Sequence, residues 1–383
     1  MPVILIPRLL MQLVSLAVLA VGAWLIWSWW DGHDVLNSRG VAYRVHGPDW
    51  RLWAAAGLLA WSFSGGRWVV LMLMRPGHAP MRARTTGRTV AAPDGSVLHV
   101  ETSGLSTGPT VVLTHGWGLN STAWGDARQA LGSRYRVVVW DLPGLGRSKG
   151  PADGRYSLDR FAEALGAVVE STGAGPVLLV GHSIGGMTTQ TFFRAASPAA
   201  RARVAGVVLV DTTHENPART MVLSGLWRVL QKPLIEPLLH LTIWLSPLAW
   251  LSSWQGHLSG SNQIVMRLTG FGRHATRGQV DLTSLLAAKG SPAVQARGDL
   301  AMLNWRVTDD LPAIDAPTLV LAGDRDIVTL PRASRTIAHE IPQAQLVEAP
   351  GGGHMGFMEL HELYDAEIAA FAQQVLHPPA AVA

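Results

Sequence analysis

The segment Gly181-His182-Ser183-Ile184-Gly185 places a serine hydroxyl between two closely spaced glycines. It directly follows the apolar run Pro176–Val180, which is typical of a strand, and precedes a helix predicted over Met187–Ala196. A strand, a Gly-x-Ser-x-Gly turn and a helix together form a nucleophile elbow, whose glycines permit a strained backbone that exposes the hydroxyl. The sequence therefore predicts that Ser183 is a nucleophile.

A second match to the same pattern, Gly146-Arg147-Ser148-Lys149-Gly150, requires a choice between the two serines. Because the chain contains 40 glycines, chance matches to the pattern are expected and the pattern alone is weak evidence. The neighbouring residues therefore decide which serine is the nucleophile. The second match lies in a Gly/Pro-rich loop, no strand runs directly into it, and Pro151 follows it. We interpret Ser148 as a loop residue.

A nucleophilic serine needs a base, and the base needs an acid that orients it. Behind an elbow of this type the chain order is serine, acid and then histidine. Asp324 and Asp326 follow a buried-type strand at 317–322, and His354 lies among glycines after a short strand. These residues are the candidate acids and the candidate base.

The chain resembles the α/β-hydrolase-fold serine hydrolases, from about Thr89 to Leu376. Four motifs carry the resemblance in order along the chain: His115-Gly116-Trp117-Gly118, Asp141-Leu142-Pro143-Gly144-Leu145-Gly146-Arg147-Ser148, the elbow at Ser183, and the segment from Gly323 to Asp326 together with His354. The resemblance implies Ser183 as nucleophile, His354 as base and Asp326 as acid. Asp324 is the rival acid, and its alternative role is that of a turn-capping carboxylate.

Acyl transfer passes through a tetrahedral oxyanion, which needs preorganised N–H donors. We expect these donors to be the backbone N–H groups of Ile184 and Trp117. The Trp117 side chain either lines the acyl pocket or only packs, and His182 is interpreted as an orienting or substrate-pocket neighbour. His115 and Asp141 are interpreted as scaffold.

Composition restricts the chemistry further. The 383 residues include no cysteine, which excludes disulfides, thiolate zinc sites and a cysteine nucleophile. The formal net charge is +4 and the isoelectric point about 9.8, but the basic residues are scattered, so no nucleic-acid partner is expected. A serine mechanism requires no metal and no organic cofactor.

The first hydrophobic excess is at the N-terminus. Residues Leu9–Trp30 contain no charged residue and would form a helix about 33 Å long, enough to cross a bilayer core. Clustered tryptophans from Trp24 to Trp30 fit an interfacial belt. A signal peptide cleaved near Val21-Gly22-Ala23 is the alternative, but the apolar run continues past that point. We interpret the segment as a membrane anchor.

A second apolar stretch, Leu52–Met74, contains Arg67, which is expected to snorkel or to pair within a helical hairpin. The segment after it is basic, with Arg75, Arg82, Arg84 and Arg88 before any acid. If both stretches span, the positive-inside rule places both ends of the hairpin and the catalytic domain on the cytoplasmic side of a bacterial inner membrane. If only the first spans, the domain faces the other side. An interfacial or partly buried helix is the alternative for the second stretch.

The remaining chain alternates strands and helices, which predicts a doubly wound, mostly parallel eight-stranded sheet. The strands are expected at 88–92, 97–102, 110–114, 136–140, 177–180, 204–210, 318–322 and 345–348. The helices are expected at 121–131, 158–171, 187–196, 331–340 and 359–376.

An insertion from Thr212 to about Trp305 is expected to form a helical cap. Its strongly apolar part, Met221–Trp254, is broken by three prolines into pieces too short to span. The cap either packs on the core alone or also dips into the membrane face. At its start, the run Asp211–Glu215 is interpreted as a hinge, with a metal site as the alternative.

The predicted domains are therefore an N-terminal anchor and linker at 1–88, a hydrolase core at 89–211 and 306–377, a cap at 212–305 and a disordered tail at 378–383. The predicted function is a membrane-anchored serine hydrolase acting on esters with an apolar acyl part, or on lipids. Carbon–carbon bond hydrolysis, cofactor-free haloperoxidase chemistry and acyl transfer could use the same triad. A non-catalytic protein that binds lipid or a partner is the alternative of another class.

Overall fold

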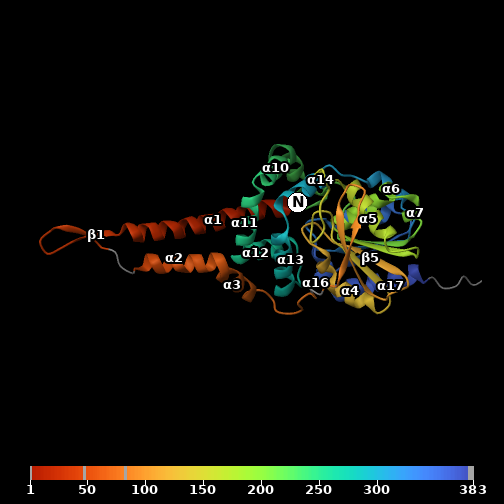
Figure 1. The fold of residues 1–383 in the computed structure, drawn as a ribbon, viewed down its shortest axis with the longest axis horizontal. Coiled ribbons are helices and arrows are strands. Elements are labelled where there is room, and N and C mark those ends of the chain that lie inside the picture. The colour runs from red at the N-terminus through yellow and green to blue at the C-terminus, as the bar shows by residue number, and fades with distance from the viewer. Residues whose placement is uncertain (1, 46–48, 82–83, 378–383) are drawn as a thin grey trace, which may run out of the picture.

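An eight-stranded sheet organises the chain, for which the computed structural model describes residues 2–45, 49–81 and 84–377 (Figure 1). Its strand order is β10-β9-β8-β7-β5-β6-β4-β3. The β3–β4 and β4–β6 pairs are antiparallel, and the other pairs are parallel. The strands are β3 (Gly87–Ala91), β4 (Val97–Gly104), β5 (Thr110–Thr114), β6 (Arg136–Trp140), β7 (Val177–His182), β8 (Val204–Val210), β9 (Thr318–Gly323) and β10 (Ala344–Ala349). This confirms the predicted sheet. The predicted tail at 378–383 lies outside the described residues.

The central strands are buried on both faces, as expected for β-branched runs in a parallel sheet. Successive residues point to opposite faces, so Val111 packs into one hydrophobic cluster and Val112 into the other. One face carries α5 (Leu158–Glu170), α6 (Ile184–Ala195) and α15 (Pro331–Glu340), while the other carries α4 (Gly125–Gly132) and α17 (His361–Leu376). The shorter helical segments are the 3₁₀ turn Ser121–Trp124, α7 (Pro198–Arg201) and α16 (Gly356–Glu359).

The helical insertion lies between β8 and β9. It consists of α8 (Pro217–Thr220), α9 (Ser224–Leu230), the π turn η3 (Gln231–Ile235), α10 (Glu236–Trp244), α11 (Ser246–Leu258), α12 (Ser261–Thr269), α13 (Arg277–Lys289) and α14 (Pro292–Leu303), and the 3₁₀ turn η4 (Thr308–Ala313) leads on to β9. Pro237 and Pro247 occupy first turns, where a missing N–H costs nothing, and Pro233 lies in η3. The segment Ser224–Trp244 is bent by 97° against α11.

Helix α1 (Pro2–Asp31) extends from the globular part of the molecule to the far end of a projection (Figure 1). With 30 residues it is about 45 Å long. Its first turns lie against the insertion, and its remaining turns run beside α2 (Trp50–Ala60). A two-stranded hairpin, β1 (His33–Leu36) and β2 (Ala42–Val45), caps the projection and was not predicted. Among the described residues, α1 is the one unbent helix long and apolar enough to cross a membrane.

The second apolar stretch is helical, but it is not one uninterrupted α-helix. Its helix changes to a π turn at η1 (Trp61–Gly65) and continues as α3 (Gly66–Met72), which packs on the insertion. Contact is close there, because a Cβ on Gly66 would overlap the Ser259 carbonyl oxygen.

Arg67 was expected to snorkel or to pair within the hairpin, and this prediction is wrong. Its guanidinium instead makes two hydrogen bonds, of 2.8 and 2.6 Å, to Asp281 of α13. The side chains are 23% and 10% exposed, so the pair is mostly removed from solvent. A charge inside an apolar helix is thus compensated by an acid of the insertion, which attaches the returning arm of the hairpin to the globular part.

We predict that Arg67→Met lowers the free energy of unfolding by about 2 kcal/mol, because it leaves the Asp281 carboxylate without its main partner. The control is Arg335→Ala, which removes the more exposed ion pair with Glu348 and should cost less than about 1 kcal/mol. Urea unfolding of detergent-solubilised protein, followed by tryptophan fluorescence, measures both. Equal losses in the two variants would contradict the proposed anchoring role of Arg67.

Candidate active site

Ser183 lies in the sharp turn between β7 and α6, with φ of 53° and ψ of −119°. A non-glycine residue at positive φ is strained, so its surroundings must hold it. The Ser183 N–H donates to Val210 O at 2.9 Å, and the Thr212 hydroxyl donates to Ser183 O at 2.7 Å. A Cβ on Gly181 would overlap the carbonyl of Gly185, which explains the glycine at the start of the turn.

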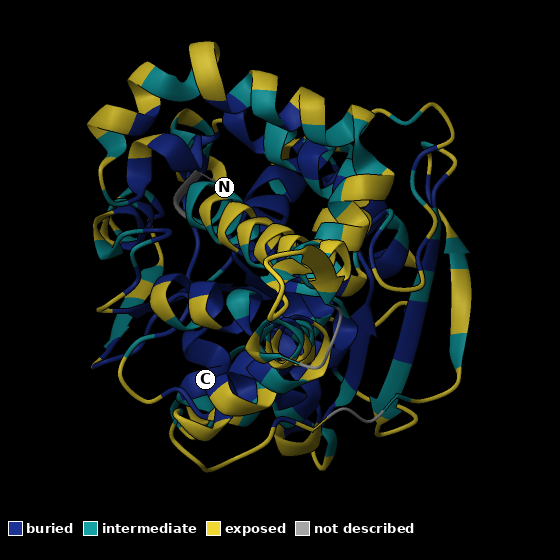
Figure 2. Cartoon of the chain, turned by 90° about the vertical axis from the view of Figure 1, so that its left-hand side faces the viewer, coloured by how far each residue is buried: buried dark blue, intermediate teal, exposed yellow. Residues whose placement is uncertain are grey.

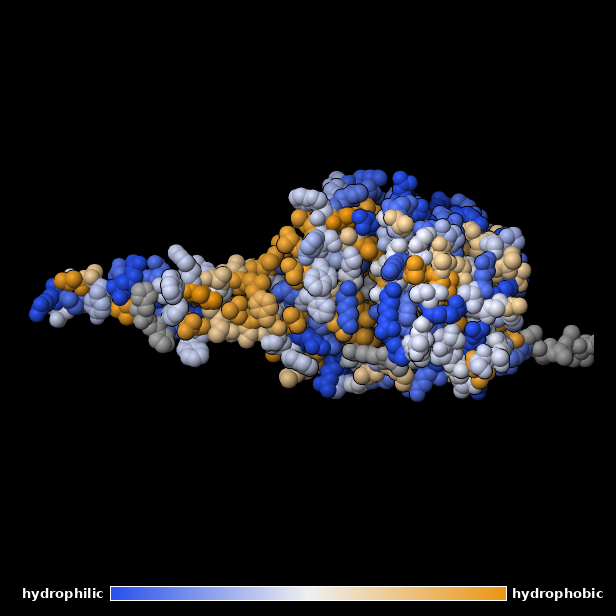
Figure 3. Space-filling model, viewed as in Figure 1, coloured by the Kyte–Doolittle hydropathy of each residue, from blue (hydrophilic) through white to orange (hydrophobic). Residues whose placement is uncertain are grey.

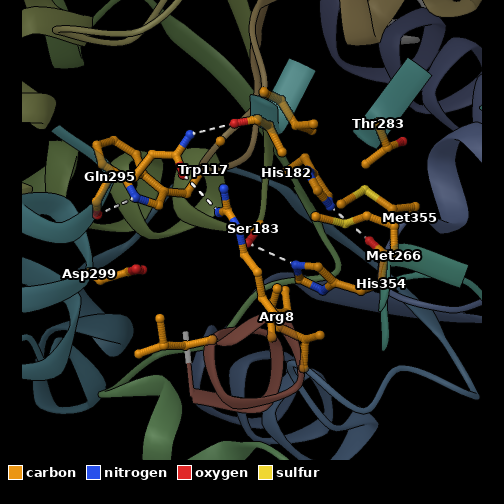
Figure 4. A pocket seen from close by; sticks show the side chains of 16 residues that line it. Arg8, Trp117, His182, Ser183, Met266, Thr283, Gln295, Asp299, His354 and Met355 are labelled. Atoms are coloured by element: carbon orange, nitrogen blue, oxygen red, sulfur yellow. Dashed lines mark hydrogen bonds between the residues drawn. The ribbon is translucent and has the colours of Figure 1, made fainter. Parts of the chain in front are cut away.

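The side chains of Ser183, His354 and Asp326 form one hydrogen-bonded chain, although they come from three separate segments. Figure 4 shows the part of this chain between Ser183 and His354. The distance from His354 Nε2 to Ser183 Oγ is 3.0 Å, and that from His354 Nδ1 to Asp326 Oδ2 is 2.8 Å. All three are at most 4% exposed. They meet because they follow the carboxyl ends of β7, β10 and β9, which lie at one edge of the sheet.

Asp326 is held by its own turn. Its Oδ1 accepts the N–H groups of Val328 and Thr329, at 2.7 and 2.9 Å, and its Oδ2 accepts the Thr329 hydroxyl at 2.6 Å. The Thr329 oxygen also lies 3.3 Å from His354 Nδ1. Sequence reasoning missed Thr329, although an aspartate followed three residues later by threonine is a signal for this kind of turn.

Asp324 takes a different position. It is exposed, and its Oδ1 accepts the N–H of Gly351 at 2.7 Å, so it caps the loop that carries the histidine. The structure therefore brings Asp326, and not Asp324, to the imidazole of His354.

The backbone around the serine offers N–H donors. Ile184 is the first residue of α6, where an N–H has no acceptor within the helix. Gly116, directly before Trp117, is so close that a Cβ added there would lie 3.4 Å from Ser183 Cβ. The loop is held by His115, whose Nδ1 bonds Gly116 O at 2.8 Å while its Nε2 accepts the Leu142 N–H at 3.0 Å. This matches the expected scaffold role of His115.

Asp141 and Ser148 also serve as scaffold. The two carboxylate oxygens of Asp141 accept the N–H groups of Ser121 and Arg147, at 2.7 and 2.8 Å. The Ser148 hydroxyl donates to Asp141 O at 2.5 Å and accepts the His99 N–H at 2.8 Å. Ser148 is thus committed to the loop, as interpreted from its context.

His182 and Trp117 line the cavity beside the serine. Burial lowers the pKa of His182 well below its ordinary value, so its ring is neutral. Its Nε2 lies 2.8 Å from His354 O and donates to it, which positions the backbone of the histidine loop. The Trp117 indole N–H donates to Gln295 O at 2.9 Å, and its ring packs against Gly298 of α14. Trp117 therefore connects the loop after β5 to the insertion.

The cavity has a volume of about 100 Å³ and is lined mainly by apolar atoms. Unexpectedly, Ile4, Leu5 and Arg8 of α1 form part of its wall. Arg8 donates to the Ser253 hydroxyl at 2.6 Å (Figure 4 shows the residue below the serine). Sequence reasoning missed these residues, because nothing in an apolar N-terminal pattern indicates which distant cavity its first turn enters.

The run Asp211–Glu215 does not converge on a single point. Asp211, with φ of 44°, accepts the Gly323 N–H at 2.7 Å, whereas His214 bonds the Thr308 hydroxyl at 2.7 Å. Within the described ranges, the one group of side chains with metal-ligand spacing is instead His78, Asp126 and His361, on the side of the molecule near α4 and α17.

Known proteins share this architecture. The family described as the alpha/beta hydrolase fold matches residues 109–359. The chain belongs to the α/β-hydrolase family. It is 29% identical over 279 residues to the pimeloyl-(acyl-carrier protein) methyl ester esterase of Nitrosomonas europaea, covering 70% of this chain and 96% of that one. The structure of an esterase from Thermogutta terrifontis is similar with a TM-score of 0.61 and 25% identity, covering 76% of this chain and all of that one.

One relative is much longer than this α/β hydrolase. The polyketide synthase ThaQ of Burkholderia thailandensis is 28% identical over 328 residues, which cover 80% of this chain but 13% of that protein. The similarity therefore concerns a small part of the synthase. The esterase-like relatives, in contrast, match along nearly their whole length.

We predict that Asp326→Asn lowers kcat by about 10³- to 10⁴-fold, because the amide no longer stabilises the imidazolium or the tautomer needed by His354. Asp324→Asn is the matched control, two residues away and on the same turn, and should retain activity within a few fold. Hydrolysis of p-nitrophenyl esters measures both. A large loss in Asp324→Asn with little in Asp326→Asn would reverse the assignment.

Proposed function

We propose that this α/β hydrolase is a membrane-anchored serine esterase for substrates with an apolar acyl part. The observation that carries the proposal is the buried Ser183–His354–Asp326 chain opening on an apolar cavity. The names of the esterase relatives support an ester substrate.

In the proposed reaction, Ser183 Oγ attacks the ester carbonyl while His354 Nε2 takes the hydroxyl proton. The tetrahedral oxyanion accepts hydrogen bonds from the N–H groups of Ile184 and Trp117. Collapse breaks the bond to the alcohol, which leaves with the proton from His354. Water then attacks the acyl-enzyme and gives a proton to His354. The bond between the carbonyl carbon and Ser183 Oγ breaks, Oγ takes the proton back from His354, and the carboxylic acid is released. Asp326 stabilises the imidazolium in both steps.

Exposed apolar side chains support membrane binding by the projection. On α1, the side chains of Trp24, Trp27 and Trp30 are 56%, 61% and 71% exposed. Contact between this apolar surface and water would be unfavourable. Figure 3 shows hydrophobic residues along the shaft of the projection and hydrophilic ones at its far end. That distribution fits a bilayer core around α1 and α2, with the polar β1–β2 hairpin on the side of the membrane away from the globular part.

Part of the insertion has the same character. Figure 2, which looks along the projection, shows many exposed residues on the outer helices of this end of the molecule. Trp244, Leu248 and Leu251 of α10 and α11 are 78%, 62% and 58% exposed. We propose that residues 212–305 form a cap over the site whose outer face rests in the membrane surface.

The contacts of α1 favour a permanent anchor over a cleaved signal peptide. Arg8 binds Ser253 and the hydroxyl groups of Ser15 and Ser261 lie 3.0 Å apart, so the helix is built into the insertion. Removing it would open the cavity wall. Both ends of the proposed hairpin then lie on the same side of the membrane as the hydrolase core. The basic residues from Arg75 to Arg88, which follow the second apolar stretch, favour the cytoplasmic side.

We predict that Ser183→Ala abolishes labelling by a fluorophosphonate and lowers ester hydrolysis by about 10⁴-fold or more. Ser148→Ala, in the other Gly-x-Ser-x-Gly match, should label like wild type. Membrane fractions carrying each variant provide the measurement. Hydrolysis by Ser183→Ala at the wild-type rate would refute the serine mechanism.

Topology can be tested with single thiols, because the chain has no cysteine of its own. We predict that Ser38→Cys, in the turn between β1 and β2, reacts with a membrane-impermeant maleimide in intact spheroplasts. Ser106→Cys, in an exposed loop of the globular part, should react only after lysis. The reverse pattern would place the hydrolase outside, and reaction of both in intact cells would exclude a spanning hairpin.

A further inference from the structure

Two further cavities adjoin the one at the serine, and all three meet at Leu5 of α1 and Asp299 of α14. One, of about 80 Å³, continues along α1 past Arg8 to Leu9 and Gln12. The other, of about 10 Å³, is a small apolar recess between Leu5 and the insertion. The space at Ser183 is therefore continued along the helix that forms the projection.

The cavity-facing positions of α1 form one stripe. Residues 5, 8, 9 and 12 follow the pattern i, i+3, i+4, i+7, which places them on one helix face over a length of about 10 Å. Leu10 and Leu13 lie on the outer side and are 56% and 62% exposed. The same helix thus shows one face to the inside of the enzyme and another to its surroundings.

The opposite wall of the continued cavity comes from the insertion. Leu239 of α10, Ala249 of α11 and Ala296 of α14 supply apolar surface. Two of the polar side chains in the lining, Thr242 and Gln295, already have internal partners. The Thr242 hydroxyl donates to Leu238 O at 2.8 Å, and the Gln295 amide donates to Ala287 O at 3.0 Å. The leucine and alanine side chains of the lining offer hydrocarbon contacts to a guest, and Arg8, Gln12 and Asp299 add polar groups to the wall.

We propose that this space is the binding site for the aliphatic chain of the substrate, lying along the inner face of α1. The ester carbonyl then sits at Ser183, and the chain points past Arg8 toward Leu9, the direction in which α1 leaves the globular part. The preferred substrate is a long single-chain acyl ester that arrives from the bilayer. This inference rests on the proposed esterase function and makes the anchor helix a part of the substrate site.

Arg8 has a positioning role in this arrangement. Its guanidinium is bound to Ser253 and lies 3.5 Å from Gln295 Oε1, while its aliphatic stem lines the passage. It holds α1 at the distance from α11 and α14 that leaves the passage open.

Leu9→Trp tests the site, because an indole at this position fills the continued cavity. The measurement is the ratio of kcat/KM for p-nitrophenyl laurate to that for p-nitrophenyl acetate, with full-length protein in detergent micelles. We expect the ratio to fall about tenfold or more, since the long chain loses its site. The matched control is Leu10→Trp, on the exposed face, which should keep the wild-type ratio.

A wild-type ratio in Leu9→Trp would overturn the proposal, as would a wild-type enzyme that prefers acetate. Absence of hydrolysis of both esters by the wild type would instead refute the esterase function. Labelling with ethyl and dodecyl fluorophosphonates shows whether each variant has a folded site. If Leu9→Trp fails to label with the short probe, Ala249→Leu fills the same cavity from the other wall and should shift the selectivity in the same direction.

Discussion

The positive φ of Ser183 is the constraint on which the rest of the site depends. It turns the serine out of the plane of the sheet, and the Val210 carbonyl and the Thr212 hydroxyl hold it there from the neighbouring strand. The strained turn is therefore stabilised by the sheet and not by the pentapeptide alone. Because the turn starts α6, the same geometry directs the Ile184 N–H toward the region of the reacting group.

The imidazole is positioned by equally rigid groups. His182, next to the serine in sequence, hydrogen-bonds the backbone of His354, so the nucleophile and its base share one link in addition to their direct contact. Phe357 packs on the His182 ring, with ring centroids 4.4 Å apart. A neutral His182 suits this role, since a second positive charge would oppose the imidazolium that forms on His354.

The elements of the sheet could be predicted because their signals are local. Apolar β-branched runs bounded by glycine and proline define strands, and Ser157 indeed begins α5 by accepting the Arg160 N–H at 3.2 Å. The choice between Asp324 and Asp326 was harder, because both occupy one turn and only the distant loop of His354 distinguishes them. Thr329 could have been noticed, since its contact with Asp326 is local.

Contacts between residues that are far apart in the sequence could not be predicted in this way. Arg67 and Asp281 are separated by 214 positions, and no local pattern connects the second apolar stretch with α13. The first turn of α1 poses the same problem: composition identifies an apolar helix but not the cavity that its end completes. Both errors share one cause, which is that the hairpin was considered apart from the domain on which it packs.

Asp211 shows why the site carries a single carboxylate opposite the imidazole. It is fully buried, and burial together with the nearby Asp326 raises its pKa well above the ordinary value, which favours the protonated form. Its contacts are to the Gly323 N–H and the Tyr364 hydroxyl, so it braces the end of β9 without competing for His354. Asp326 instead accepts three hydrogen bonds from its own turn and a fourth contact from His354. The hydrogen bonds that hold each carboxylate, more than the position of the acids in the sequence, therefore distinguish Asp326 as the partner of the imidazole.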